Sequence, residues 1–196
     1  MKTYSVKIEV ISDLCFGKHV SEPKKSEETH AQFEQRTWQQ KVNRTKDGQC
    51  FMQPFALKNC LESAAKWLSM GIPGEGKKTF TKRFASGVLI ADKMLLSDPS
   101  GKLITIEDVE PVTLFVPSDG KRGSGRRVER IFPIIHEWHT SIDIIVLDDK
   151  VSLAVLQKHL EACGQFIGLG SMRVENGGIN GRFLITECVE VKVKAA

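Results

Sequence analysis

Cysteine is scarce and scattered in this sequence, which limits the sites and compartments that fit it. The 196 residues include five cysteines, an odd number, and no two of them form a C-x-x-C pair. A disulfide framework is therefore not expected, and neither is a structural zinc site, whose ligands usually come in closely spaced pairs. The pattern is typical of reduced thiols in a reducing compartment, which predicts a cytoplasmic protein.

Long apolar runs are also absent from the sequence. No segment approaches the roughly 18 consecutive apolar residues that indicate a membrane span. Residues 1–6 alternate between polar and apolar instead of forming the apolar centre of a signal peptide. We therefore expect no contact with a membrane. With 41% hydrophobic and 27% charged residues, the composition predicts a folded chain, and the length favours one domain over 1–196 with insertions.

Hydrophobic periodicity predicts both helices and strands. Val6, Ile8 and Val10 alternate with polar neighbours, as in a half-buried strand, whereas Leu57, Leu61 and Leu68 recur at helical spacing. On this basis we expect strands over 4–12, 112–116, 141–147 and 183–193, a strand-like run over 86–96, and helices over 54–70 and 151–163.

Residues 17–53 are polar and too many for a plain connection, so they are interpreted as an insertion with a polar helix over 27–40. It is either a solvated excursion or a grip that carries basic side chains toward a ligand, namely Lys18, His19, Arg36, Lys41, Arg44 and Lys46. Without it, the order is β-α-β-β-α-β. This order predicts an α+β, ferredoxin-like (RRM-like) fold, with both helices on one face of an antiparallel sheet and the other face free for RNA.

The net charge of +4 is mild, but the basic residues gather on glycine-rich loops. One loop, 71–84, carries Lys77, Lys78, Lys82 and Arg83. A long hairpin over 112–135 carries Lys121, Arg122, Arg126 and Arg127 around its tip. Glycine lets the backbone approach a ligand, and guanidinium groups suit phosphate oxygens. These loops are either solvated surface or contacts to a nucleic-acid backbone.

A third glycine-rich segment, 164–182, follows the second predicted helix. It contains Gly168, Gly170, Gly181, Arg173 and Arg182. So many glycines indicate close backbone approach, either to the chain itself or to a phosphate backbone.

Two sequence motifs that would indicate a nucleotide site or a metal site are incomplete. Residues 71–78 fit a Walker A loop except that Lys78 replaces the hydroxyl residue that holds Mg²⁺. His136 and His139 lack an evident third metal ligand. A dinucleotide site also fits badly, because its glycine loop should precede a helix. We expect neither a cofactor nor a metal.

The glycine-rich segment resembles the glycine-rich loop of the RAMP superfamily, the ferredoxin-like proteins that form the backbone of CRISPR RNA-guided complexes. Residues 53–64 are similar to the start of that family's first helix, and the order of elements agrees. The chain also looks similar to stand-alone relatives in phages and mobile elements. The resemblance implies nucleic-acid contacts by Lys58, Gly168, Gly170, Arg173 and Gly181.

Taken together, these patterns predict a protein that binds the backbone of single-stranded RNA or DNA without sequence preference, with RNA favoured. Homo-oligomers along the strand and CRISPR-type protein partners are expected partners as well. Two alternatives stay open. One is a metal-independent ribonuclease on the same fold, and the other is a phage-encoded module that mimics or inhibits a CRISPR complex.

Overall fold

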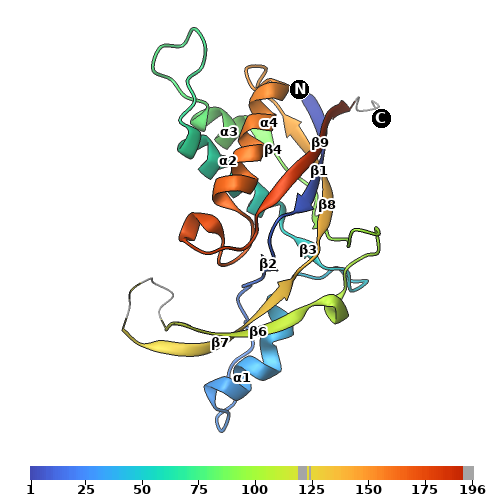
Figure 1. Cartoon of the computed structure of the whole chain (residues 1–196), viewed down its shortest axis with the longest axis vertical. Coiled ribbons are helices and arrows are strands. Elements are labelled where there is room, and N and C mark those ends of the chain that lie inside the picture. The colour runs from blue at the N-terminus through green and yellow to red at the C-terminus, as the bar shows by residue number, and fades with distance from the viewer. Residues whose placement is uncertain (119–122, 124, 192–196) are drawn as a thin grey trace.

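The main sheet unites both ends of the chain (Figure 1). In this computed structural model, residues 1–118, 123 and 125–191 are described. The sheet has the strand order β4-β8-β1-β9, and every neighbouring pair is antiparallel. Its strands are β1 (Lys2–Val10), β4 (Val88–Leu89), β8 (His139–Val146) and β9 (Phe183–Val191).

Alternating burial fixes which face of the main sheet meets the core. Tyr4, Val6 and Ile8 of β1 are almost fully buried, as their period of two predicts. Two helices pack on this face, α2 (Pro54–Leu68) and α4 (Leu153–Ala162), and they contact each other (Figure 1). The α+β arrangement with an antiparallel sheet is thereby confirmed.

Local signals explain where the two helices begin and end. Pro54 occupies the first turn of α2, where its missing N–H costs nothing, and α2 ends at Ser69 in the left-handed conformation. Ser152 caps α4, and a π-helical turn, η3 (Cys163–Ile167), continues it into the glycine-rich segment. A short 3₁₀ turn, η4 (Val174–Asn176), lies within that segment.

Two expectations between α2 and the hairpin need correction. The run 86–96 is not one strand, because β4 joins the main sheet while β5 (Met94–Leu95) pairs with β3 (Phe51–Met52) in a separate two-stranded sheet. The loop 71–84 is shorter than expected, because its last residues begin α3 (Thr81–Gly87), whose Phe84 is buried in the core.

The predicted hairpin forms an arm that projects from the main sheet (Figure 1). Its strands are β6 (Glu110–Pro117), preceded by the 3₁₀ turn η2 (Ile106–Asp108), and β7 (Arg127–Ile135), which also pairs with β2 (Leu14–Cys15). Residues 119–122 and 124 of the tip, and with them Lys121 and Arg122, lie outside the described residues.

The insertion forms a helix beside this arm, and this helix is shorter than the one expected over 27–40. Thr29 and Gln32 make a capping box at the start of α1 (His30–Thr37), which continues into η1 (Trp38–Lys41). Two buried charges then fasten this unit to β7. Lys41 Nζ donates to Glu34 at 2.5 Å and to the Ile131 carbonyl at 2.6 Å, while the Ile131 N–H donates to Glu34 at 2.8 Å.

Candidate nucleic-acid interface

A cleft of about 430 Å³ opens where the first turns of α2, the glycine-rich segment and the chain after β2 meet. Its polar lining consists of Lys18, His19, Asn43, Gln53, Asn59 and Arg173. No aspartate or glutamate lines it among the described residues. The volume falls in the range of roughly 300–1,000 Å³ that is usual for small-ligand sites. The cleft therefore offers cations and neutral hydrogen-bonding groups without a repelling carboxylate in its wall.

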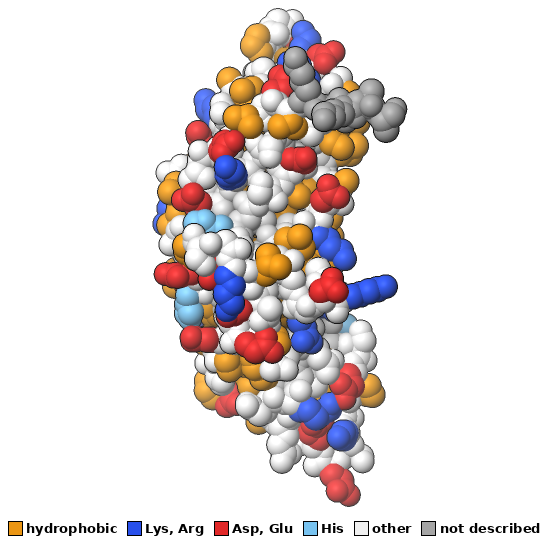
Figure 2. Space-filling view, turned by 90° about the vertical axis from the view of Figure 1, so that its right-hand side faces the viewer, with side chains coloured by type: hydrophobic (Ala, Val, Ile, Leu, Met, Phe, Trp, Pro, Cys, Tyr) orange, Lys and Arg blue, Asp and Glu red, His pale blue; other side chains and the backbone are white. Residues whose placement is uncertain are grey.

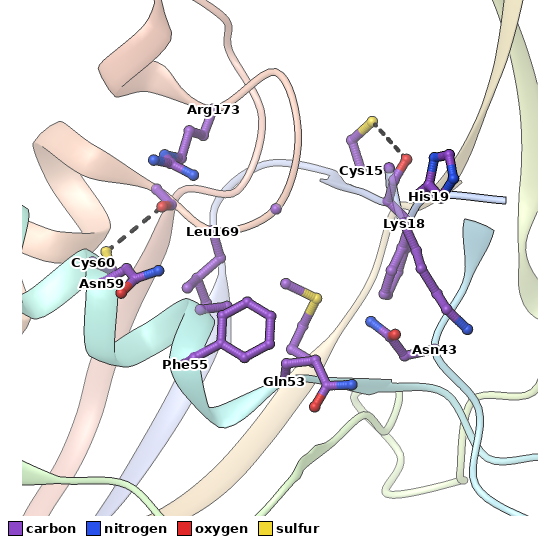
Figure 3. A pocket seen from close by; sticks show the side chains of 16 residues that line it. Cys15, Lys18, His19, Asn43, Gln53, Phe55, Asn59, Cys60, Leu169 and Arg173 are labelled. Atoms are coloured by element: carbon purple, nitrogen blue, oxygen red, sulfur yellow. Dashed lines mark hydrogen bonds between the residues drawn. The ribbon is translucent and has the colours of Figure 1, made fainter. Parts of the chain in front are cut away.

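Figure 3 shows how these side chains face one another across the cleft. Arg173 and Asn59 lie on the side of α2 and the glycine-rich segment, whereas Lys18 and His19 lie on the opposite side. Phe55, 60% exposed, stands between the two sides near Gln53. An exposed aromatic ring between two cations is the arrangement with which proteins stack a base and hold its phosphates.

The glycines of the cleft are required by the chain's own packing. A Cβ on Gly170 would lie 2.4 Å from the Cys15 carbonyl oxygen, and one on Gly181 would lie 1.9 Å from that of Leu169. Both residues also have positive φ angles, which glycine adopts without strain. Of the two possibilities open for this segment, close approach to the chain itself is the one that the geometry shows for these glycines.

Backbone hydrogen bonds hold the segment against the end of β1 and against β2. The Gly181 N–H donates to the Asp13 carbonyl at 2.7 Å, and the Ser171 N–H donates to the Cys15 carbonyl at 2.8 Å. Within the segment itself, the Gly168 N–H donates to the Cys163 carbonyl at 2.8 Å and ends η3. Segments from opposite ends of the chain thus fix the cleft wall that carries Arg173.

The basic surface continues beyond the cleft. Lys18 lines the cleft and two adjoining hollows, one of which contains Arg44 and the other Arg130 with Phe132. Among the described residues, Glu34 is the one carboxylate in the linings of these two hollows, and it is already bonded to Lys41 and to the backbone of β7. A run of cations with aromatic rings therefore leads from the glycine-rich segment to the middle of β7 in the arm.

Two buried thiols belong to the wall of the cleft. Cys15 and Cys60 are buried, and burial raises the pKa of Cys15 to about 11, so its thiol stays protonated near neutral pH. Cys60 directs its sulfur toward the carbonyls of Cys163 and Gly168. Both cysteines are therefore packing residues of the cleft wall.

Two predicted binding residues are engaged inside the fold. Lys58 donates from Nζ to the carbonyl oxygens of Phe84, Ala85 and Val88, which ties α2 to the end of α3. Arg83 forms ion pairs with Glu75 at 2.6 Å and with Asp148 at 2.5 Å. Both cations serve contacts of the chain itself.

The remaining predicted residues lie on separate surfaces. Lys77 and Lys78 are exposed on the loop after α2, and Lys82 is exposed on α3; none of the three lines the cleft. Arg126 and Arg127 are exposed on the arm. Arg182 immediately precedes β9, where its backbone bonds to residues 11 and 12. The basic loops therefore do not form one patch.

The open face of the main sheet differs from the RNA-binding face that the sequence suggested. The exposed positions across β1, β8 and β9 hold neutral and charged side chains of both signs, and Lys7 pairs with Glu187 at 2.6 Å. Figure 2, which views the side away from the helices, shows acidic and basic side chains interspersed there. The cleft on the helical side is the more basic of the two surfaces.

His136 lies in an acidic setting instead of near a third metal ligand. Its two ring nitrogens are 3.0 Å from Asp13 and 3.3 Å from Glu110, and its hydrogen bond to Asp13 raises its pKa. Within residues 1–118, 123 and 125–191, no cluster of three or more potential ligands has the geometry to hold a metal ion. No helix in that part of the chain is long and apolar enough to cross a membrane.

The fold of this chain is similar to that of one chain in a CRISPR complex of known structure. No protein-family model and no curated protein matches the sequence. A chain from the cryo-EM structure of type III-B Cmr-beta bound to cognate target RNA aligns over 97% of this chain and 61% of its own, with a TM-score of 0.51 and 11% identity. A chain of a CRISPR RNA-guided surveillance complex aligns over 92% and 66%, with a TM-score of 0.37 and 13% identity.

The first of these likenesses shows a shared fold. The chain spans 61% of the length of that neighbour, so the neighbour has parts with no counterpart here. Sequence reasoning had placed Gly168, Gly170 and Arg173 in the binding surface, and the structure brings these three to the cleft. The sequence alone did not indicate Phe55, Asn59, Gln53 or Asn43, because a single polar or aromatic residue carries no signal until the fold sets it beside the others.

Proposed function

We propose that this protein binds single-stranded RNA in the cleft, without sequence preference. The observation that carries the proposal is a lining in which Lys18, His19 and Arg173 face an exposed Phe55. Among the described residues no carboxylate lines the cleft itself, and Glu175, which pairs with Arg173 at 2.7 Å, lines the neighbouring hollow. Cations hold phosphate oxygens, and the ring offers a stacking face that accepts every base. The fold shared with a chain of an RNA-bound complex supports the same reading.

The strand order also supports kinship with the ferredoxin-like RAMP proteins. The order β4-β8-β1-β9, with α2 and α4 as the crossovers, is the order of that plan once β1, β4, β8 and β9 are counted as its four strands. The glycine-rich segment then occupies the position between the second helix and the last strand, where the sequence resemblance lies. Assembly of several copies along one strand is part of this proposal.

Asn43, Gln53 and Asn59 give the cleft a means to prefer RNA over DNA. Amides both donate and accept hydrogen bonds, and a 2′-hydroxyl does the same. We therefore expect RNA to bind more tightly than DNA of the same sequence. The outer contacts, Arg126 and Arg127 on the arm and the residues Lys77, Lys78 and Lys82, extend the grip on the phosphate backbone.

The test is fluorescence anisotropy of labelled RNA and DNA of matched sequence, titrated at low and physiological salt. Lys18→Ala with Arg173→Ala should weaken binding and reduce the slope of log affinity against log salt by about 1.4, because two phosphate contacts are lost. Lys150→Ala with Lys158→Ala removes two exposed cations outside the cleft and serves as the control. Equal affinities for both variants would remove the cleft from the proposal.

A metal-independent ribonuclease is a second candidate because His19 lies in the cleft beside Lys18. An imidazole can move a proton to or from a ribose hydroxyl, and a lysine can stabilise the negative charge that develops on the phosphate. Labelled RNA incubated with the protein and EDTA tests this idea. Cleavage that His19→Ala abolishes would support it, whereas intact RNA that remains bound would support binding alone.

A further inference from the structure

A second aromatic site lies on α2, outside the cleft. Trp67 is 65% exposed and stacks on Phe166 of η3, which is 38% exposed, with ring centroids 5.7 Å apart and an angle of 26° between the planes. The two rings border a hollow of about 600 Å³ that also contains Ser63, Lys66 and Glu175. Tryptophan is enriched at binding interfaces, so this exposed pair of rings beside a hollow is a candidate binding site.

This hollow continues the surface of the cleft. Phe55 and Asn59 line the cleft and Ser63 and Trp67 line the hollow, and these four residues follow one another at the four-residue spacing that places them on one face of α2. Twelve residues separate Phe55 from Trp67, which is about 18 Å along the helix. The glycine-rich segment lies between the two sites, with Arg173 in the cleft and Val174 in the hollow.

Charge also connects the two sites. Arg173 of the cleft pairs with Glu175 of the hollow at 2.7 Å, and Lys66 lies beside them. Farther along, Lys77 and Lys78 are exposed beyond the C-terminal end of α2. The Trp67 ring therefore stands between two basic surfaces, the cleft and the loop after α2.

We infer that Trp67 and Phe166 form a second stacking site, which takes an unpaired base of the same RNA strand whose other nucleotides occupy the cleft. This inference rests on the proposed function and extends the path of the strand by the roughly 18 Å that separate Phe55 from Trp67 along α2. The polar residues Ser63, Lys66 and Glu175 surround the rings and can bond to the polar edge of a base. The centre of a protein–protein interface is usually depleted of such charged residues, so a base suits this site better than a partner protein does.

Tryptophan emission gives a direct test, because the other two tryptophans are shielded: Trp138 is fully buried and Trp38 is partly buried. An oligouridylate of about 12 nucleotides, within the site sizes of single-strand binding folds, should quench Trp67 in the parent protein. Trp67→Phe should keep most of the affinity and lose the quenching. Trp67→Ala should lose about five- to 150-fold in affinity, the range measured for one base–aromatic stack.

The outcomes separate this inference from the proposed function. If Lys18→Ala with Arg173→Ala weakens binding while Trp67→Ala binds like the parent and the emission does not change, the cleft stands and the stacking site is overturned. If the parent does not bind the oligonucleotide at low salt, both are overturned. If Trp67→Ala instead abolishes self-association in sedimentation and leaves RNA affinity unchanged, the rings contact a second copy of the chain, which also overturns the inference.

Discussion

The buried charges that join α1 to the arm lead to a sharp prediction about stability. The side chains of Lys41 and Glu34 are only 10% and 5% exposed, and together they make three bonds to each other and to the backbone of Ile131. Lys41→Met leaves the carboxylate of Glu34 buried with a single N–H donor and leaves the Ile131 carbonyl without this ammonium. Removal of one partner of such a pair costs about 3–5 kcal/mol.

The size of the effect is set by burial and not by the ion pair alone. Glu34→Gln should cost a similar amount, since it strands the ammonium of Lys41. The combined variant, Glu34→Gln with Lys41→Met, should be no less stable than either single variant, because no buried charge is then left over. The coupling energy of the double-mutant cycle should accordingly be about 3 kcal/mol or more.

Urea denaturation measures these free energies, and hydrogen exchange shows where they act. We expect α1 and β7 to lose protection first, while β1 and β8 stay protected, because the pair touches only the insertion and the arm. Lys102→Met is a matched control: its ion pair with Asp108 has a similar length, 2.9 Å, but Lys102 is 66% exposed. Exposed pairs contribute roughly 0–1 kcal/mol. A loss below about 1 kcal/mol for Lys41→Met would refute the reasoning, because it would mean that water reaches the pair.

Three further predictions concern the arm, the glycine-rich segment and His136. Arg126→Ala with Arg127→Ala should weaken RNA binding equally for all sequences and lower the salt slope by about 1.4 in anisotropy titrations; parent-like binding would remove the arm from the interface. Gly181→Ala should lower the free energy of unfolding by much more than the roughly 1 kcal/mol expected of Gly101→Ala. Both glycines have positive φ angles, but only at Gly181 would the new Cβ lie 1.9 Å from a carbonyl oxygen. Equal losses of stability in urea denaturation would contradict this. His136→Gln should lower Tm at about pH 5.5 and leave it unchanged at about pH 8.5. The hydrogen bond to Asp13 raises the pKa of His136 above its ordinary 6.5, so the stabilisation by the charged ring is complete below that value and is lost as pH rises through the folded-state pKa. A difference in Tm that stays constant with pH would exclude titration as the cause.

The sequence by itself determined the class of the fold and most of its elements. The alternation of Val6, Ile8 and Val10 and the spacing of Leu57, Leu61 and Leu68 predicted β1 and α2, because burial of one face imposes a period on the chain wherever that face is long enough. Two-residue strands such as β4 and β5 are too short to show a period, so the run 86–96 looked like one strand. The hairpin was found because turn residues separate two apolar runs.

The site depended far more on tertiary structure. Charge and glycine content selected Lys58 and Arg83 as readily as Arg173, yet the first two make their contacts away from the cleft, whereas Arg173 lines the cleft and pairs with Glu175 beside it. Lys18 and Phe55 are 37 residues apart in the sequence, and Phe55 and Arg173 are 118 residues apart. Only the meeting of β2, the start of α2 and the segment before β9 sets them around one space. Composition fixes how many cations a chain carries, whereas burial and neighbouring carboxylates decide which of them remain available to a ligand.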